Sequence, residues 1–383
     1  MLLPVAAASG WLAAQRSARK EKVQCVGDAG PVYFRGLNHL LNEEPDKAID
    51  AFVEMLEVDS DTVETHLALG NLFRRRGEVE RAIRIHQNLI ARPALTREQR
   101  AQALLELGQD YMRAGLFDRA ENLFRELKET KLHVRPALSN LLVIYEKERD
   151  WDSCLEVADQ LEAISGEQMQ LQESHYHCEL ALVAKTKGRA SEASSHLKRA
   201  VGIYRGCVRA KHLQAQFDAE SGDYASAIRV LRQTAEQNPD YLSEVLSDIA
   251  SNFRKLADLG GLRTYLEETV AAHPQAGAQL VLADLIREQE GETAAVAYLS
   301  DQLASTPTLG LLLRTIEMNS RMPEGGSVQF LDGLRPHIHR LLEETPLYQC
   351  SHCGFAAKTL HWQCPSCRSW STIKRKTGCY SEI

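Results

Sequence analysis

The 383-residue sequence lacks the short motifs that mark the common classes of enzyme. It contains no Walker A phosphate loop, no G-x-G-x-x-G fingerprint, no H-E-x-x-H zinc motif and no G-x-S-x-G nucleophile elbow. The 23 glycines and 12 prolines make up about 9% of the chain, which excludes collagen-like and low-complexity proteins. The formal net charge of −7 argues against binding of nucleic acid over the whole surface. We therefore expect a globular protein without catalytic activity.

Features of secreted proteins are also missing. No Asn-x-Ser/Thr glycosylation sequon occurs, and the nine cysteines are an odd number, so they cannot all pair as disulfides. Four cysteines fall within 18 residues near the C-terminus, whereas the other five are scattered along the chain. This usage indicates a reduced compartment, such as the cytoplasm.

The chain begins with a short apolar run, Leu2–Ala14, which is followed by a basic flank up to Lys22. A secretory signal would carry its positive charge before the apolar run, so this order indicates an N-terminal membrane anchor over residues 1–22. Thirteen residues in a helix span about 20 Å, whereas the hydrocarbon core of a bilayer is about 30 Å thick. A shortened transmembrane anchor, a segment at the membrane interface and an ordinary packed helix therefore stay open as alternatives.

A repeat of about 34 residues runs through most of the chain. The small residues that open the second helix of each unit align at Ala48, Ala82, Ala120, Cys154, Ala193 and Ala227. Three of the five steps are 34 residues, and the other two are longer by four or five. A glycine lies five residues before most of these positions, where a turn would join two antiparallel helices. A single pair of helices cannot bury its apolar face alone, so the units must stack.

This spacing resembles the tetratricopeptide repeat, and it predicts an all-α, right-handed solenoid of about nine units over residues 29–342. In such arrays the first helix of each unit lines the concave face. The aligned register places four polar residues on that face, and these are Asn71, Arg74, Gln109 and Arg113. Two amides and two arginines suit recognition of peptide backbone and carboxylates, so we expect these residues to bind a partner. The alternative is an ordinary solvated surface.

Residues 345–383 contain two C-x2-C pairs, Cys350 with Cys353 and Cys364 with Cys367. Each pair supplies two thiolates from one tight turn, and two facing turns would form a closed tetrahedral site of four sulfurs. A segment this short cannot build a sufficient apolar core, so one bound metal ion must supply much of its folding energy. The four-cysteine site suits both zinc and iron. The segment looks like a rubredoxin-type or zinc-ribbon module.

Several segments resemble one known family. The apolar start LLPVAAASGW, the repeat segments HLALGNLFRRRGEVERAIRIHQ and LGQDYMRAGLFDRAENLF, and the tail CGFAAKTLHWQCPSCRSWSTIK are closely similar to the lipopolysaccharide assembly protein B family of Gram-negative bacteria. The resemblance covers nearly the whole chain and matches the four metal-binding cysteines one for one. The first and last segments are the most specific, because the repeats share features with any tetratricopeptide array.

The resemblance implies a non-catalytic adaptor of the inner membrane, with a single N-terminal span and the repeats facing the cytoplasm. It implies that the chain promotes degradation, by the membrane protease FtsH, of the deacetylase that commits sugar nucleotide to lipid A synthesis. Other lipopolysaccharide assembly proteins would be further partners, nucleic acid would not, and a homodimer remains open.

Two other functions stay open beside the adaptor. Rubredoxin-like sites cycle iron, so one alternative is an electron-transfer protein on a solenoid scaffold. The other is a zinc ribbon that binds nucleic acid. Residues 345–383 carry only five basic residues against one acidic residue, which makes the nucleic-acid alternative the weakest of the three.

Overall fold

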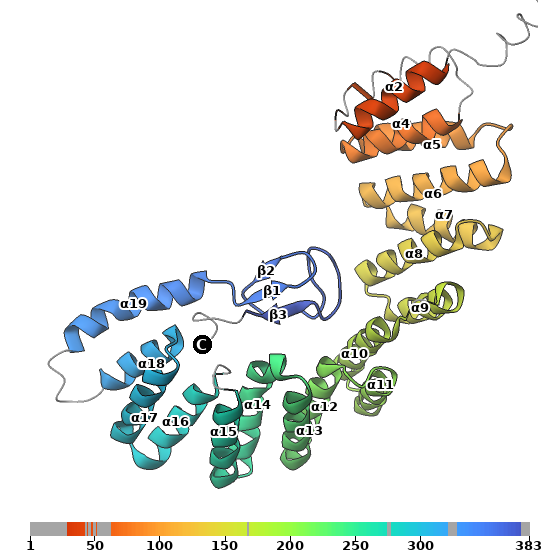
Figure 1. The fold of residues 1–383 in the computed structure, drawn as a ribbon. Coiled ribbons are helices and arrows are strands. Elements are labelled where there is room, and N and C mark those ends of the chain that lie inside the picture. Colours follow the sequence, from red (N-terminus) through yellow and green to blue (C-terminus); the bar gives the residue numbers. More distant parts are fainter. Residues whose placement is uncertain are drawn as a thin grey trace, which may run out of the picture. The chain divides into compact units, whose positions relative to one another are not determined.

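The computed structural model describes residues 29–42, 44, 47–48, 51, 63–166, 168–273, 277–320 and 328–376. Contacts along the chain divide it into two compact units, residues 1–167 and residues 168–383. Both units are built from helices, and a small sheet lies at the C-terminal end of the second (Figure 1). The expected helical solenoid with a small C-terminal module is confirmed.

The first unit consists of helices that pack as successive pairs. Its helices are α2 (Ala29–Leu41), α4 (Val63–Arg75), α5 (Val79–Ile90), α6 (Arg97–Ala114), α7 (Phe117–Thr130), α8 (Val134–Glu148) and α9 (Trp151–Ser165). From α4 onward each helix contacts the next, and α6 also contacts both α4 and α8. One layer of the unit is therefore formed by α4, α6 and α8, and the other by α5, α7 and α9.

The second unit continues the pairing and ends in the sheet. Its helices are α10 (Gln170–Thr186), α11 (Ala190–Ile203), α12 (Val208–Glu220), α13 (Tyr224–Gln237), the 3-10 helix η1 (Pro239–Tyr241), α14 (Leu242–Lys255), α15 (Leu259–Ala272), α16 (Ala278–Glu290), α17 (Glu292–Ser305), α18 (Leu309–Asn319) and α19 (Val328–Glu344). The strands are β1 (Tyr348–Cys350), β2 (Ala356–Ala357) and β3 (Ile373–Arg375). The helices of this unit follow an arc, and the strands lie on its inner side (Figure 1).

The small residue that opens each second helix is completely buried. The fourth residues of α5, α7, α9, α11 and α13 all have 0% exposure, and they are Ala82, Ala120, Cys154, Ala193 and Ala227. Leu262 in α15 and Ala295 in α17 are the fourth residues of their helices and are buried to the same degree. The predicted register is confirmed, and it continues beyond the positions that the sequence aligned.

The turns inside the helix pairs require left-handed backbone. Gly77 and Gly115 lie five residues before the buried small residue, with φ of 83° and 76°. Arg149 and Ala257 occupy the same place in their units with φ of 60° and 57°. A residue with a Cβ atom adopts this conformation at a cost of about 1–2 kcal/mol, so these two turns are held by the packing of the helices around them.

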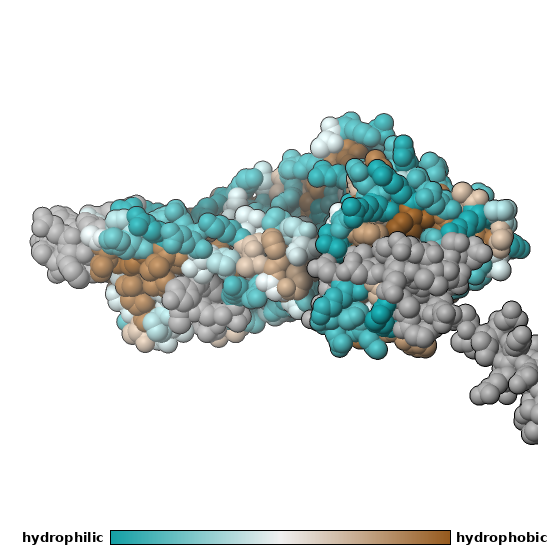
Figure 2. All heavy atoms as spheres, turned by 90° about the horizontal axis from the view of Figure 1, so that it is seen from above, coloured by the Kyte–Doolittle hydropathy of each residue, from teal (hydrophilic) through white to brown (hydrophobic). Residues whose placement is uncertain are grey.

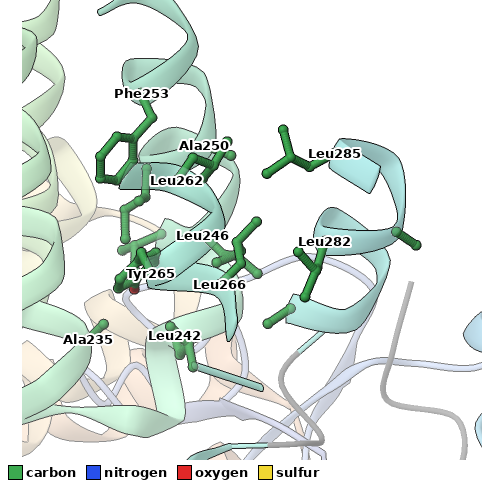
Figure 3. Packing of buried hydrophobic residues seen from close by; sticks show 14 of the residues in the cluster. Ala235, Leu242, Leu246, Ala250, Phe253, Leu262, Tyr265, Leu266, Leu282 and Leu285 are labelled. Atoms are coloured by element: carbon green, nitrogen blue, oxygen red, sulfur yellow. The ribbon is translucent and has the colours of Figure 1, made fainter. Parts of the chain in front are cut away.

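Helices α12 to α18 of the second unit share a hydrophobic core. Leu246 and Phe253 of α14 pack with Leu262 and Leu266 of α15 and Leu282 of α16 (Figure 3). Burial of one such side chain contributes about 1.5–3 kcal/mol, so successive helices are joined mainly through these contacts. On the face of the molecule seen in Figure 2, hydrophilic residues cover most of the described surface.

The expectation of a location in the inner membrane, with a single N-terminal span, is wrong, because the described helices contradict it. In the ranges that the structure describes, no helix combines the length and the apolar character that a membrane crossing requires. The longest of them, α6, has 18 residues and carries charged side chains along its length. Residues 1–22, which carried the expectation, lie outside the described residues.

We expect Gly108→Ala to destabilise the first unit. A Cβ atom at Gly108 would lie 2.5 Å from the ring of Phe124, which is fully buried and cannot move aside. Overpacking of this kind costs about 1–3 kcal/mol, and thermal unfolding followed by circular dichroism measures it. Gly202→Ala is the matched control, because Gly202 is helical and exposed, with no atom within 4 Å of the added Cβ. Equal melting temperatures for the two variants would contradict the close packing of α6 on α7.

Candidate metal centre

The C-terminal module is a three-stranded antiparallel sheet with strand order β2-β1-β3. Strand β1 lies in the middle, where Gln349 pairs with Ala356 on one side and with Lys374 on the other. Cys350 is the last residue of β1, so the sheet fixes the first metal-binding turn directly.

Two turns of similar build carry the four cysteines. In the first turn the Gly354 amide donates a hydrogen bond to the Cys350 carbonyl at 3.0 Å, and in the second the Arg368 amide donates to the Cys364 carbonyl at 2.8 Å. Gly354 and Arg368 both have left-handed backbone, with φ of 77° and 61°. Glycine adopts this conformation readily, whereas Arg368 carries a side chain and gives no sign of it in the sequence.

The four sulfurs form one compact cluster. Cys350 Sγ lies 3.7 Å from Cys367 Sγ, Cys353 Sγ lies 3.7 Å from Cys364 Sγ, and all four lie within 4.8 Å of one another. Disulfide sulfurs would be about 2.05 Å apart, so these thiols are free. Metal–sulfur bonds of about 2.3 Å in a tetrahedron place the sulfurs about 3.8 Å apart. The cluster is therefore a four-cysteine metal site, and its geometry suits a single zinc or iron ion.

Nearby hydroxyl groups favour the charged form of two of these thiols. A hydrogen bond with Thr372 lowers the pKa of Cys350, and hydrogen bonds with the hydroxyl and backbone of Ser369 lower the pKa of Cys367 to about 5. Burial has the opposite effect on Cys364, whose pKa rises to about 11. A metal ion binds thiolates and displaces the remaining protons, so its affinity must fall as the pH falls.

Two aromatic rings attach the module to the helices of the second unit. The ring of Trp370 stacks on His175 of α10, with centroids 4.7 Å apart, and meets the edge of Tyr176 at 6.0 Å. The ring of Trp362 stacks on Tyr241 of η1 at 5.7 Å. A small metal-binding segment thus extends its limited core by packing on the surface of the helices.

Polar contacts accompany the stacked rings. The hydroxyl of Ser371 lies 2.7 Å from Nε2 of His175, and the hydroxyl of Tyr348 donates a hydrogen bond to Glu244 of α14 at 2.5 Å. Lys374 forms an ion pair with Asp240 at 2.6 Å. The module is therefore held on α10, η1 and α14 at several points.

Sequence analysis missed the role of His175. His175 and His177 are both buried, since each is less than a tenth exposed. However, His175 and Glu244 each stand 18 residues before the fully buried residue of the following helix, Ala193 and Leu262 respectively. Residues at this repeated position lie where the module docks, and the repeat register was the signal that could have found them.

The four expected partner-binding residues differ in their surroundings. Arg74 forms ion pairs with Glu106 at 2.6 Å and Asp110 at 2.9 Å, and it donates a hydrogen bond to Asn71. Gln109 is half-buried and Arg113 is exposed. Arg74 is thus tied into the contact between α4 and α6, so a change of its charge would disturb stability as well as binding. The partner-binding role of these residues stays a prediction.

We expect Cys364→Ser to release the metal and to unfold the module while the helices persist. A closed four-sulfur site loses its geometry with any one ligand, whereas the helix pairs are stabilised by contacts with their neighbours. Metal analysis should show the loss of about one equivalent, and far-ultraviolet circular dichroism should change little.

Ser366→Ala is the matched control for this variant. Ser366 lies in the same turn, is exposed and has no sulfur, so the variant should keep the metal. A collapse of helix content together with metal loss in Cys364→Ser would mean that the helices depend on the module.

We expect the stability of the second unit to fall below pH 6.5 through His175. Burial lowers the pKa of His175 to about 3, and the charge of Arg209 adds to this effect. The ordinary pKa is about 6.5, so between pH 6.5 and 3 the unfolded chain binds a proton that the folded chain excludes. The stability is fully present above pH 6.5 and is lost by about 1.4 kcal/mol per pH unit below it.

Urea unfolding between pH 7.5 and 5.5, followed by tryptophan fluorescence on metal-loaded protein, measures this loss. His175→Phe keeps a ring that can stack on Trp370 and removes the proton, so its stability should depend less on pH. The same pH dependence in both proteins would exclude His175 as its source.

Comparison with known proteins agrees with the two parts of the fold. Residues 348–375 match the family model described as a rubredoxin metal binding domain, and residues 65–101 match the tetratricopeptide repeat model. The solved structures that match include the MamA protein, at 20% identity and a TM-score of 0.36 over 47% of this chain and 94% of that chain. Another is a tetratricopeptide repeat protein from Parabacteroides merdae, at 11% identity and a TM-score of 0.28 over 81% of this chain and 98% of that chain.

Two curated relatives match almost from end to end. Lipopolysaccharide assembly protein B of Escherichia coli K12 is 38% identical over 379 residues, which are 99% of this chain and 97% of the relative. The protein of the same name from Haemophilus influenzae is 36% identical over 98% of this chain and 96% of the relative. Identity at this level over the full length of both proteins shows that the chain belongs to the lipopolysaccharide assembly protein B family.

Proposed function

We propose that this protein is a non-catalytic adaptor that regulates lipopolysaccharide synthesis. It would bind the deacetylase of the lipid A pathway and promote its degradation by the protease FtsH. The relatives that support this proposal carry lipopolysaccharide assembly in their name and match the whole chain. The fold supports it too, because stacked helix pairs present long rows of side chains to a protein partner.

The observation that carries the proposal is the way in which the metal module is attached. Trp370 and Trp362 are turned toward His175 and Tyr241 of the helices, so the module is part of the surface of the second unit. Metal binding then fixes the shape of that surface by holding the module folded. A structural role of this kind suits an adaptor, whose work is to present surfaces in a fixed arrangement.

The turnover of the deacetylase tests the proposal. Cells that lack this protein should degrade the deacetylase several-fold more slowly, and the wild-type chain should restore its turnover only when FtsH is active. A crosslinked pull-down with the tagged full chain should recover the protease together with the deacetylase. Normal turnover of the deacetylase in cells without this protein would overturn the proposal.

An electron carrier is the second candidate, and the exposure of Cys353 favours it. A ligand at the surface brings the metal close to a redox partner in solution. Voltammetry of the purified full chain distinguishes the two functions: a reversible one-electron couple of bound iron would support electron transfer, whereas a zinc-only site would exclude it.

A further inference from the structure

The first unit carries three basic residues at one repeated position. Arg75 of α4, Arg113 of α6 and Lys147 of α8 each stand seven residues before the fully buried small residue of the following helix. All three side chains are exposed. Because α6 contacts both α4 and α8, these residues lie along one layer of the unit. We call Arg75, Arg113 and Lys147 the basic row.

The described part of the second unit has no such row at the same position. Its residues seven before the fully buried residue are Thr186, Glu220, Lys255 and Glu288. Both glutamates are neutralised inside the unit, since Glu220 pairs with Lys185 at 2.6 Å and Glu288 pairs with Arg254 at 3.3 Å. At this position the second unit therefore carries charges of both signs and its glutamates are paired, whereas the first unit carries three basic residues.

The charges of the basic row are largely unpaired among the residues that the structure describes. In the described part of the chain, neither Arg75 nor Arg113 forms an ion pair. The nearby carboxylate of Glu78 is taken by Arg76 at 3.4 Å and by Arg81 at 2.7 Å. The ammonium group of Lys147 lies 4.5 Å from the centre of the Phe117 ring, which positions its charge at the surface. Like charges in a row repel one another, so an anion that fits the row would be bound favourably.

The spacing of the row indicates the shape of that anion. Helices in contact lie about 8–10 Å apart, so the backbone positions of successive members of the row are separated by roughly that distance. A polyproline II helix has three residues per turn and rises about 3.1 Å per residue, which places every third side chain on one face about 9 Å apart. Side chains on one face of a β-strand repeat at about 6.6 Å, which does not fit the row.

We propose that the basic row binds an extended acidic segment of a partner protein, with Asp or Glu at every third residue. The guanidinium groups of Arg75 and Arg113 can each hold a carboxylate by two hydrogen bonds. Gln109 lies one turn before Arg113 on α6 and offers an amide to the peptide backbone. This inference rests on the proposed adaptor function and names the chemistry of the segment that the adaptor recognises.

Two fluorescent peptides of equal composition test the proposal with the full chain. One carries Glu at every third residue, separated by Pro-Pro, and the other carries the same glutamates in one block. The wild-type chain should bind the periodic peptide several-fold more tightly than the block peptide. The double variant Arg75→Glu, Arg113→Glu should weaken binding of the periodic peptide about tenfold, because two ion pairs become two repulsions.

A matched control separates the row from general attraction of charge. The double variant Arg84→Glu, Lys128→Glu changes the net charge by the same amount as the row variant. Both residues are exposed and lie on α5 and α7, outside the row, so this variant should bind the periodic peptide as the wild-type chain does. Thermal unfolding of both double variants shows that they remain folded.

Four results would overturn the proposal. The first three are absence of periodic-peptide binding by the wild-type chain, equal affinity for the two peptides, and an equal loss of affinity in the control double variant. In the fourth, the Arg75→Glu, Arg113→Glu variant loses binding to anionic vesicles but keeps its affinity for the periodic peptide. The last result would assign the row to a membrane surface. A pull-down in which the row variant still recovers the deacetylase would exclude the row but leave the adaptor function standing, whereas failure of the wild-type chain would contradict the function itself.

Discussion

The close approach of two helices at a fully buried small residue is the constraint on which this structure depends. Ala82, Ala120 and Ala193 are completely buried. On the facing helices, the absence of a side chain at Gly70 and Gly108 leaves room for the rings of His86 and Phe124. This packing recurs about every 34 residues, so it sets the direction in which each unit stacks on the next. Side chains at other repeated positions are thereby aligned in rows.

The metal module uses one of these rows. His175 and Glu244 occupy the same position in their units, and they meet Trp370 and Tyr348 of the module. The four cysteines fold the segment around one ion, and the stacked rings then join it to the helices. The bound metal keeps the short sheet folded, and the folded sheet and the helical surface then stabilise one another.

Sequence reasoning predicted the features that repeat or that follow a fixed spacing. The register of Cys154 and the four metal-binding cysteines were correct because each obeys a local rule of size or spacing. The docking of Trp370 on His175 was missed, since these residues are far apart in the chain and their contact depends on tertiary packing. The left-handed backbone of Arg149 was missed for a related reason. A sequence signals left-handed backbone only through glycine, whereas at Arg149 the packing of neighbouring helices imposes it on a residue with a side chain.

The two units handle charge in different ways, and the register explains how. Arg74 is drawn into the contact between α4 and α6 by Glu106 and Asp110, whereas Arg75, one residue later, faces away from this network and stays exposed. In the second unit Glu220 and Glu288 at the corresponding position pair with Lys185 of α10 and Arg254 of α14. A charge that is paired within the chain is not available to bind a partner. Arg75 and Arg113 of the first unit, which form no ion pair among the described residues, are therefore available for binding, whereas Glu220 and Glu288 of the second unit are not.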